Sequence, residues 1–311
     1  MSISFNALSK AYGKIQALRE VTFTLEPGDV LGYIGPNGAG KSTTMRILTG
    51  LIRDYQGSVS IDGRNIETMR DELHRRIGFV PQEAGFQEWR TVSHALRTFG
   101  QLSGLSGQDL ERRIGAALQR LDLKDVATRR IALLSGGMRQ RLRFAQALLH
   151  DPDILILDEP LNGLDPASRF QMKKLIQELA DGKRYIIFSS HILGEMEDLA
   201  TRIAILHQGT IKRFGTPEGL RAEFGLGSVI EIESSRRDSL QADWFAGLPV
   251  ERCQAQGRNR YLLHLTGGTP VETCMPAVMG VLARHDFALS SLRHLQPSLE
   301  DVYLALTGEG A

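Results

Sequence analysis

The run at residues 35–42 constrains the fold of this chain more than any other feature of its sequence. It reads GPNGAGKS, which fits the pattern G-x-x-x-x-G-K-[ST], and it lies between a strand-like segment, 30–34, and a helix-like segment, 42–50. Glycines let the backbone curl so that its N–H groups point inward at an anion, and the following helix adds the positive end of its dipole. An ordinary glycine-rich turn is the alternative, but the strand before it and the helix after it favour a phosphate-binding loop.

A second strand, with acidic residues at its end, adds the other half of a nucleotide site. Residues 154–157, ILIL, form a continuous apolar run of the kind buried in a parallel sheet, and Asp158 and Glu159 follow. Ligands of open α/β sheets collect at the carboxyl ends of strands. Asp158 is thus placed to hold magnesium, and Glu159 to polarise a water for attack on the γ-phosphate. Without the loop at 35–42 a solvated turn would be the preferred interpretation; with that loop the catalytic one is favoured.

Four further motifs follow in the order typical of one protein family. They are FVPQ at 79–82, LSGGMRQR at 134–141, NGLD at 162–165 and SSH at 189–191. Together with the loop and the acidic pair, they resemble the ATP-binding subunit of an ABC transporter over residues 2–216. The resemblance implies an α/β fold of the P-loop NTPase type, with a parallel-sheet core, an antiparallel β layer and a helical subdomain.

The resemblance also implies roles for individual residues, with ATP and Mg²⁺ as cofactors. Glu159 is expected to be the catalytic base, His191 the switch histidine that hydrogen-bonds the γ-phosphate, and Gln82 the residue that touches magnesium and the attacking water. The expected magnesium ligands are Ser42, Gln82 and Asp158. The expected ATP contacts are Tyr12, Gly35, Asn37, Gly38, Ala39, Gly40, Lys41, Ser42, Thr43, Ser135, Gly136, Gly137 and Asp165.

Three of these residues have plainer interpretations when they are taken alone. A glutamine after a strand, such as Gln82, is usually solvated, and a histidine at a strand end, such as His191, is more often a half-buried structural residue. Tyr12 resembles the aromatic residue that stacks on adenine, and its alternative is a tyrosine of an edge strand. The position of each residue among the other motifs favours the catalytic and stacking roles.

The signature run implies a second copy of the chain. Ser135 followed by Gly136 and Gly137 at a helix start offers a hydroxyl and unobstructed N–H groups to an anion, although such a cap can also simply begin a helix. In the family, this cap faces the γ-phosphate held by the loop of a second subunit. Because the chain has one loop and one signature, a head-to-tail homodimer with two-fold symmetry is expected. Met138 and Leu161 depart from the commonest family pattern, and neither change removes a phosphate ligand.

Composition and cysteine usage limit the classes of function. The chain has 311 residues and a formal net charge of +1, so no global attraction to nucleic acid is expected. Cys253 and Cys274 lie far apart, with no C-x-x-C motif and no nearby paired histidines, which favours reduced thiols over a metal site. We find no secretory signal and no apolar stretch of the roughly eighteen residues needed to cross a bilayer.

A chain of this kind is therefore expected to be cytoplasmic and peripheral on the cytoplasmic face of the cell membrane. Another polypeptide would supply the channel, and the resemblance implies a separate integral membrane permease of about six helices per chain.

The sequence divides into two expected domains, an ATP-binding domain at 1–216 and a small α+β accessory domain at 217–311. Helical periodicity dominates at 91–149, which predicts the helical subdomain. Arginines are frequent there; they could face anionic lipid, but a solvated helix surface is the favoured interpretation. After residue 216 the pattern predicts β-α-β-β-α-β with an added helix, the order of a ferredoxin-like layer, and places the first helix at 238–245.

The closing segment at 297–308 narrows the resemblance. It predicts an amphipathic helix with Ser298 as its N-cap. The side chains of its apolar stripe are Leu299, Val302, Tyr303 and Leu306. The segment also resembles the ending of ABC exporters whose permeases are separate six-helix chains, the class associated with drug and antibiotic export, sodium extrusion, gliding motility and copper-enzyme maturation.

The expected function is an ATPase subunit that drives export, with ATP binding closing the dimer and hydrolysis reopening it. One alternative is a soluble ABC ATPase that acts on ribosomes or DNA, but such proteins usually carry two nucleotide domains or a long coiled coil, and this sequence has neither. A non-hydrolytic scaffold is disfavoured by the intact Glu159. For the C-terminal segment, a packing and dimer-stabilising role is favoured over a ligand sensor. The sequence does not identify the cargo.

Overall fold

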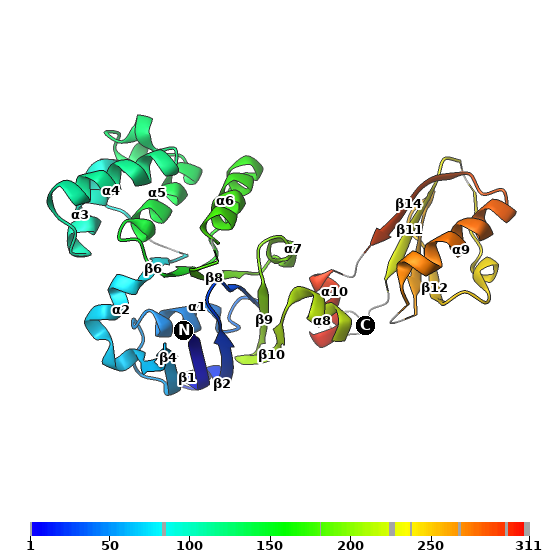
Figure 1. The fold of residues 1–311 in the computed structure, drawn as a ribbon, viewed down its shortest axis with the longest axis horizontal. Coiled ribbons are helices and arrows are strands. Elements are labelled where there is room, and N and C mark those ends of the chain that lie inside the picture. The colour runs from blue at the N-terminus through cyan, green and yellow to red at the C-terminus, as the bar shows by residue number, and fades with distance from the viewer. Residues whose placement is uncertain are drawn as a thin grey trace. The chain divides into compact units, whose positions relative to one another are not determined.

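The chain forms two compact units, Met1–Thr216 and Pro217–Ala311, in the computed structural model (Figure 1). The structure describes residues 2–82, 85–180, 182–223, 228–236, 238–266, 269–295 and 298–307. Each unit has its own hydrophobic core. We therefore describe each unit by itself.

A six-stranded sheet forms the centre of the first unit. Its strands are β3 (Val30–Ile34), β6 (Ile77–Val80), β7 (Ile154–Leu157), β8 (Tyr185–Ser190), β9 (Arg202–His207) and β10 (Thr210–Gly215). Their order is β10-β9-β3-β8-β7-β6, and all pairs are parallel except β10 with β9. Every residue of β3, β7 and β8 is buried, as expected for parallel strands covered on both faces. The predicted parallel-sheet core is confirmed.

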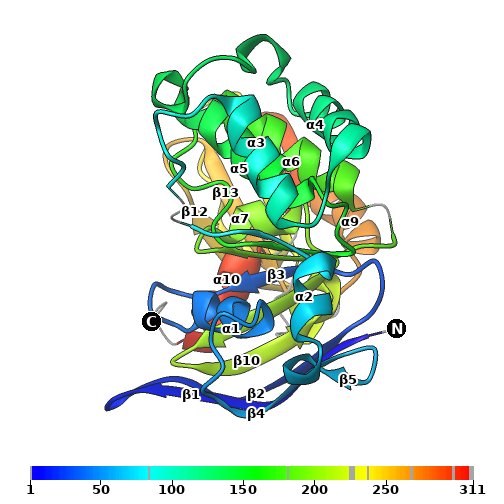
Figure 2. The same cartoon turned by 90° about the vertical axis from the view of Figure 1, so that its left-hand side faces the viewer.

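An antiparallel layer packs below this sheet, as Figure 2 shows. Its strands are β1 (Ile3–Tyr12), β2 (Ile15–Leu25), β4 (Gln56–Ile61) and the short β5 (Arg64–Asn65), in the order β2-β1-β4-β5. Helix α1 (Lys41–Leu48) lies between the two sheets, and one hydrophobic core joins residues of both sheets and of α1. Because the loop at 35–40 joins the end of β3 to the start of α1, this packing holds the loop between rigid elements.

Helices form a third layer on the opposite face of the central sheet. They include α3 (Val92–Leu102), α4 (Gly107–Arg120) and α5 (Gly136–Leu148), which all lie within the segment 91–149, and α6 (Pro166–Leu179). Two short helices, α2 (Arg70–Arg76) and α7 (Leu193–Glu197), flank the sheet. Several arginines of this layer form ion pairs: Arg112 and Arg113 with Asp109, and Arg141 with Asp122.

The second unit is built on a four-stranded antiparallel sheet. Its strands are β11 (Val229–Ser234), β12 (Val250–Ala255), β13 (Arg260–Leu265) and β14 (Leu289–Leu295), in the order β12-β13-β11-β14. This is the strand order of a ferredoxin-like layer. Helix α9 (Val271–Arg284) packs on one face, where its buried side chains meet those of β11 and β13.

The helix predicted at 238–245 is wrong. Only one 3₁₀ turn, Ala242–Phe245, forms there. Asp238 is instead held by the sheet, because its carboxylate accepts from the N–H of Ala288 at 2.8 Å and from the hydroxyl of Ser234 at 3.0 Å. Its carbonyl oxygen also accepts from the hydroxyl of Tyr261. These contacts hold Asp238 beside the sheet and override the local helical periodicity.

Two helices complete the second unit. Helix α8 (Pro217–Glu223) contacts α10 (Leu299–Thr307), which forms at the predicted place. Leu299 and Val302 of its apolar stripe are fully buried. Pro297 and Gly308, the ends of the predicted closing motif, lie outside the described residues. Over the part of the chain that the structure describes, the helices are too short or too polar to cross a membrane.

Candidate active site

The loop between β3 and α1 forms a cradle that requires glycine. Gly38 and Gly40 have φ values of 83° and 110°, in the left-handed region that favours glycine. A Cβ atom at Gly40 would lie 2.5 Å from the carbonyl oxygen of Ala17, and one at Gly35 would lie 2.3 Å from that of Leu206. A Cβ at Gly38 would meet no atom within 4 Å. The loop is thus tightly packed on its protein side and open beside Gly38.

Lys41 is buried within this loop. Its ammonium group donates to the carbonyl oxygens of Gly35 at 2.6 Å and Pro36 at 3.3 Å, and its side chain is 5% exposed. Burial lowers the pKa of Lys41, while the carboxylates of Glu159 and Asp158 act in the opposite direction without cancelling that effect. The carboxylates therefore offset only part of the cost of burying the positive charge of Lys41. A bound phosphate would add further negative charge beside it.

The remaining predicted loop residues differ in exposure. Asn37 is exposed, Ala39 is buried, and Ser42 and Thr43 are half-buried at the start of α1. The hydroxyl groups at this helix start and the N–H groups of the first turn are therefore accessible to an anion.

The acidic pair follows β7 and is organised by Ser189, at the adjacent position of β8. The Ser189 hydroxyl donates to Asp158 Oδ1 at 2.7 Å and accepts from the backbone N–H of Glu159 at 2.9 Å. Strands β7 and β8 are paired in register at Leu157 and Phe188, so Asp158 and Ser189, the next residue along each segment, are neighbours. One buried hydroxyl thus orients both acids.

Glu159 is the point at which the predicted catalytic residues meet. Its Oε2 atom accepts from Gln82 Nε2 at 3.3 Å and from Asn162 Nδ2 at 3.2 Å, and it lies 3.4 Å from His191 Nδ1. Its Oε1 atom lies 3.7 Å from the ammonium group of Lys41. The structure therefore brings Lys41, Gln82 and His191 around one carboxylate.

The backbone of Glu159 is strained. Its φ angle is 49°, in the left-handed region that costs a non-glycine residue about 1–2 kcal/mol. The residue is nevertheless only 8% exposed and carries the contacts described above. Strain at a residue with this set of polar partners is typical of functional sites.

The donor set beside Glu159 fits a magnesium ion. Asp158 Oδ2 is buried and lacks a hydrogen-bond partner among the described residues. A buried carboxylate oxygen without a donor calls for a ligand or a water. Carboxylate, hydroxyl and amide oxygens, as at Asp158, Ser42 and Gln82, are the ligands that this hard cation prefers.

The signature turn begins α5 and packs against the start of α6. The Ser135 hydroxyl accepts from the N–H of Met138 at 3.2 Å, and a Cβ at Gly137 would lie 2.6 Å from Ser168 Oγ. Asp165, the N-cap of α6, accepts from the N–H of Ser168 at 3.0 Å and from its hydroxyl at 2.7 Å. Among described residues, no hydrogen bond or ion pair joins 135–137 to 35–42 of the same chain.

A buried glutamine links this signature helix to the acidic pair. Gln140 is 5% exposed and donates to the carbonyl oxygen of Pro160 at 2.8 Å. Pro160 directly follows Glu159. This hydrogen bond joins α5 directly to the backbone next to the acid.

Tyr12 lies at the end of β1, and its ring is available to a ligand. The residue is 47% exposed, and the ammonium group of Lys10 lies 5.1 Å from the ring centroid. An exposed ring of this kind can stack on a base.

Comparison with known proteins identifies the family. The family model described as ABC transporter matches residues 18–162. The chain is 31% identical to the linearmycin resistance ATP-binding protein LnrL of Bacillus subtilis over 306 residues, which cover 97% of this chain and 96% of that protein. The chain belongs to the ABC transporter family. As an ATP-binding subunit of that family it is an ATPase.

Two further similarities cover the whole chain and the fold. The chain is 32% identical to Nod factor export ATP-binding protein I of Burkholderia lata, over 98% of this chain and 97% of that protein. Among solved structures, the dimeric structure of MJ0796, a bacterial ABC transporter cassette, is 26% identical with a TM-score of 0.63. That similarity covers 69% of this chain and 98% of the cassette.

Sequence reasoning missed two residues of this ABC ATPase site. Ser189 and Asn162 both lie inside motifs that the sequence displays, but no site role is predicted for either. Ser189 lies near the carboxyl end of β8, the strand adjacent to the one that Asp158 follows. Recognising this requires the strand order, which the sequence does not provide.

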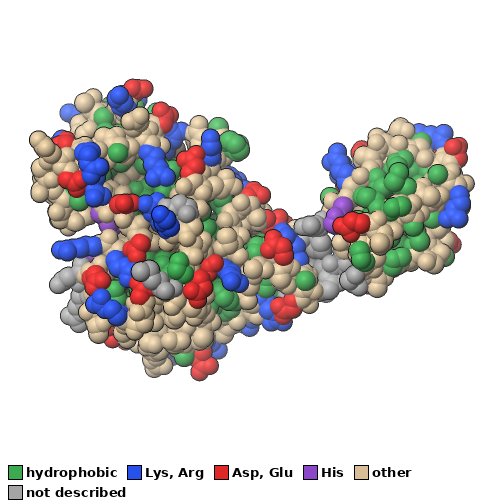
Figure 3. Space-filling model, in the orientation of Figure 1, with side chains coloured by type: hydrophobic (Ala, Val, Ile, Leu, Met, Phe, Trp, Pro, Cys, Tyr) green, Lys and Arg blue, Asp and Glu red, His purple; other side chains and the backbone are tan. Residues whose placement is uncertain are grey.

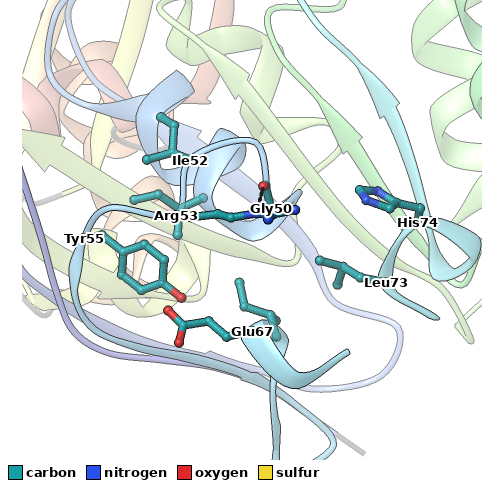
Figure 4. Close-up of a pocket in the computed structure, with 9 residues that line it drawn as sticks. Gly50, Ile52, Arg53, Tyr55, Glu67, Leu73 and His74 are labelled. Carbon is teal, nitrogen blue, oxygen red and sulfur yellow. Dashed lines mark hydrogen bonds between the residues drawn. The ribbon is translucent and has the colours of Figure 1, made fainter. Parts of the chain in front are cut away.

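A separate cavity of about 220 Å³ lies near the other end of α1 (Figure 4). Ile47, Gly50 and His74 contribute to its lining, and the Tyr55 hydroxyl points toward the Glu67 carboxylate. Burial, with a smaller effect of Glu67, raises the pKa of Tyr55 to about 12. Residues 35–42 do not line this cavity, so it is distinct from the nucleotide site of the ABC ATPase.

Proposed function

We propose that this ABC ATPase drives export through a separate membrane permease, by ATP-driven closure of a head-to-tail homodimer. The observation that carries the proposal is the convergence of Lys41, Gln82 and His191 on Glu159. It supports a hydrolytic site rather than a scaffold, because each group has a distinct part in phosphoryl transfer.

The loop at 35–42 and Lys41 bind the triphosphate. The N–H groups of the loop and the positive end of α1 hold the β-phosphate, and the Lys41 ammonium group moves from the Gly35 carbonyl to the phosphate oxygens. Tyr12 stacks on the adenine ring. Ser42, Gln82 and Asp158 would hold Mg²⁺, which would supply positive charge to offset that of the phosphates.

Glu159 orients the attacking water and accepts its proton. Gln82 and Asn162 fix the carboxylate by donating to Oε2, and Ser189 fixes the backbone behind it. His191 donates to the γ-phosphate. These contacts position the water in line with the bond that breaks, which is where most of the rate enhancement in phosphoryl transfer arises.

A second copy of the chain completes each site. The Ser135 hydroxyl and the N–H groups of Gly136 and Gly137 face the γ-phosphate of the partner copy, with Asp165 at the same interface. The absence of bonds between 135–137 and 35–42 among the described residues supports this arrangement. Two chains then enclose two nucleotides.

The functions of similar proteins support export through a permease. The Nod factor export protein and the linearmycin resistance protein match nearly the full chain, including the segment after residue 216. The chain would act on the cytoplasmic face of the membrane with a permease of about six helices per chain. A soluble ABC ATPase with a non-transport partner is the alternative, and nothing in these relatives favours it.

Dimer closure is tested with Glu159→Gln. This variant retains the phosphate cradle and lacks the base, so it should bind ATP, and ATP should shift its sedimentation strongly toward the dimer. Lys41→Ala is the matched control and should show no ATP-induced shift toward the dimer, because it loses nucleotide binding. A Glu159→Gln protein that turned over ATP at the wild-type rate would contradict the assigned base.

Membrane coupling is tested by purification from cells. The chain is expressed with and without the membrane protein encoded beside it, and detergent-solubilised membranes and ribosome fractions are analysed separately. Co-purification with the membrane protein, together with ATPase activity that changes when the two are combined in vesicles, supports transport. Recovery only with ribosomes or DNA would refute the export function.

A further inference from the structure

The solvent-exposed face of α9 carries no charged side chain between residues 273 and 283. Thr273, Pro276, Gly280 and Ala283 are exposed at spacings of three, four and three residues, and Met279 beside them is 51% exposed. Figure 3 shows hydrophobic side chains gathered on the visible face of the second unit, over α9 and beside it. Helices at a protein surface normally carry charged or polar side chains on this face, so a continuous apolar stripe points to a partner.

Two residues of this stripe are unfavourable in a helix and have no explanation within the unit. Pro276 lies inside α9, and Gly280 follows one turn later. Glycine and proline are the residues least compatible with a helix interior. A Cβ at Gly280 would meet no atom within 4 Å, so the fold itself does not require glycine there. A partner that approaches the helix backbone closely would require it.

The charges at the two ends of the stripe identify the partner. Glu272 lies in the first turn and Arg284 in the last turn of α9, and neither has an ion-pair partner among the residues that the structure describes. A two-fold axis near Val278 would place Glu272 of one copy opposite Arg284 of the other, and the reverse. The same axis places Pro276 opposite Gly280. The stripe is therefore complementary to itself in an antiparallel arrangement, as a two-fold interface requires.

We propose that α9 pairs with α9 of a second copy of this chain, antiparallel, about a two-fold axis near Val278. The proposal rests on the proposed homodimer, which brings two copies together. The pair buries the apolar stripe of both copies, seats the ring of Pro276 over Gly280 of the other copy, and forms an acid–base pair at each end. The second unit thereby becomes a dimerisation element that does not depend on nucleotide.

The register is tested by cysteine cross-linking of the full chain. In a Cys253→Ser background, with the buried Cys274 retained, Thr273→Cys is made in a copy with one tag and Ala283→Cys in a copy with another. Oxidation of the mixture should give a mixed disulfide in much higher yield than either variant alone, because these positions face each other only between copies. Equal yields in all three samples, or no cross-link, would overturn the register.

The contribution of close packing is tested with Gly280→Leu. Gly115→Leu is the matched control, since Gly115 is also an exposed helix glycine whose Cβ position meets no atom within 4 Å. Without nucleotide, Gly280→Leu should raise the dissociation constant of the dimer at least tenfold, and Gly115→Leu should leave it unchanged. Equal effects of the two variants would overturn the proposal.

The two proposals fail separately. If Glu159→Gln dimerises with ATP but Thr273→Cys and Ala283→Cys do not cross-link, the α9 pairing is wrong and the proposed function stands. If the cysteines cross-link but ATP does not drive dimerisation, the proposed function is wrong. A cross-link from Thr273→Cys to the membrane protein, with none between copies, would replace the second copy as the partner and so refute the pairing.

Discussion

Replacing Ser189 with alanine removes two hydrogen bonds that order the acidic pair. Ser189 is fully buried, so no water can replace its hydroxyl. Asp158 loses a hydrogen bond to a charged group, and the N–H of Glu159 is left buried without an acceptor. The lost hydrogen bond to a charged group and the buried N–H left without an acceptor together reduce the free energy of unfolding by about 3 kcal/mol. We expect a loss of that size in the unfolding free energy of the ATP-binding unit.

The same substitution should slow hydrolysis far more than it weakens ATP binding. The contacts of Lys41 and of the loop at 35–42 do not involve Ser189. Misplacement of a catalytic group by about 1 Å costs roughly 100-fold in rate. We therefore expect a single-turnover rate about 100-fold lower, which corresponds to about 2.7 kcal/mol of activation free energy, with nucleotide affinity nearly unchanged.

Urea unfolding, nucleotide titration and single-turnover ATP hydrolysis of the full chain measure these effects. Ser234→Ala is the matched control, because Ser234 is a buried serine of the second unit that donates to the carboxylate of Asp238 and the carbonyl of Ala288. It should destabilise the second unit and leave hydrolysis unchanged. If Ser189→Ala hydrolysed ATP at the wild-type rate, the assignment of Ser189 as the residue that orders the acids would be refuted.

Substitutions at three positions, Lys41, Ser135 and Glu195, test separate parts of the site. Burial lowers the pKa of Lys41 in the folded protein, so the unfolding free energy of the wild type should rise as the pH increases toward the usual lysine pKa of about 10.4. The Lys41→Met variant should lack this rise. An equal pH dependence of the two unfolding free energies would contradict the assignment. In urea unfolding, Ser135→Ala should lower the unfolding free energy by about 1 kcal/mol, and Ser135→Gly should lower it by only a few tenths. Both variants should impair ATP-driven dimerisation. Normal dimerisation of Ser135→Gly would exclude a contact between the Ser135 hydroxyl and the nucleotide of the partner copy. The Glu195 carboxylate accepts from the Ser190 hydroxyl at 2.8 Å and so holds the turn that carries His191. Glu195→Ala should therefore lower kcat more than it raises KM. Glu195→Gln should restore most of kcat.

Local sequence patterns were sufficient to predict most of the fold and of the site. The apolar runs at 30–34 and 154–157 are strands because both faces are buried, and the glycine-rich loop has its own short-range geometry. The convergence on Glu159 could be anticipated from the order of the motifs, since they all follow strands of one parallel sheet.

What the sequence could not provide depends on contacts between distant residues. The strand order β10-β9-β3-β8-β7-β6 decides that Ser189 lies beside Asp158, and nothing in the local sequence of Ser189 encodes it. The predicted helix at 238–245 failed for the same reason, because Asp238 is held by Ser234, Tyr261 and Ala288 from other parts of the unit. Local helix propensity does not decide the structure where hydrogen bonds to the sheet hold the same residue in another conformation.

The left-handed backbone at Glu159 has a consequence for how this position changes under selection. Glycine adopts a φ of 49° without strain, so a library of variants sorted only by resistance to heat should admit glycine at this position. A library sorted by ATP turnover should retain glutamate. Comparing the residues recovered in the two experiments would separate what this position contributes to folding from what it contributes to catalysis.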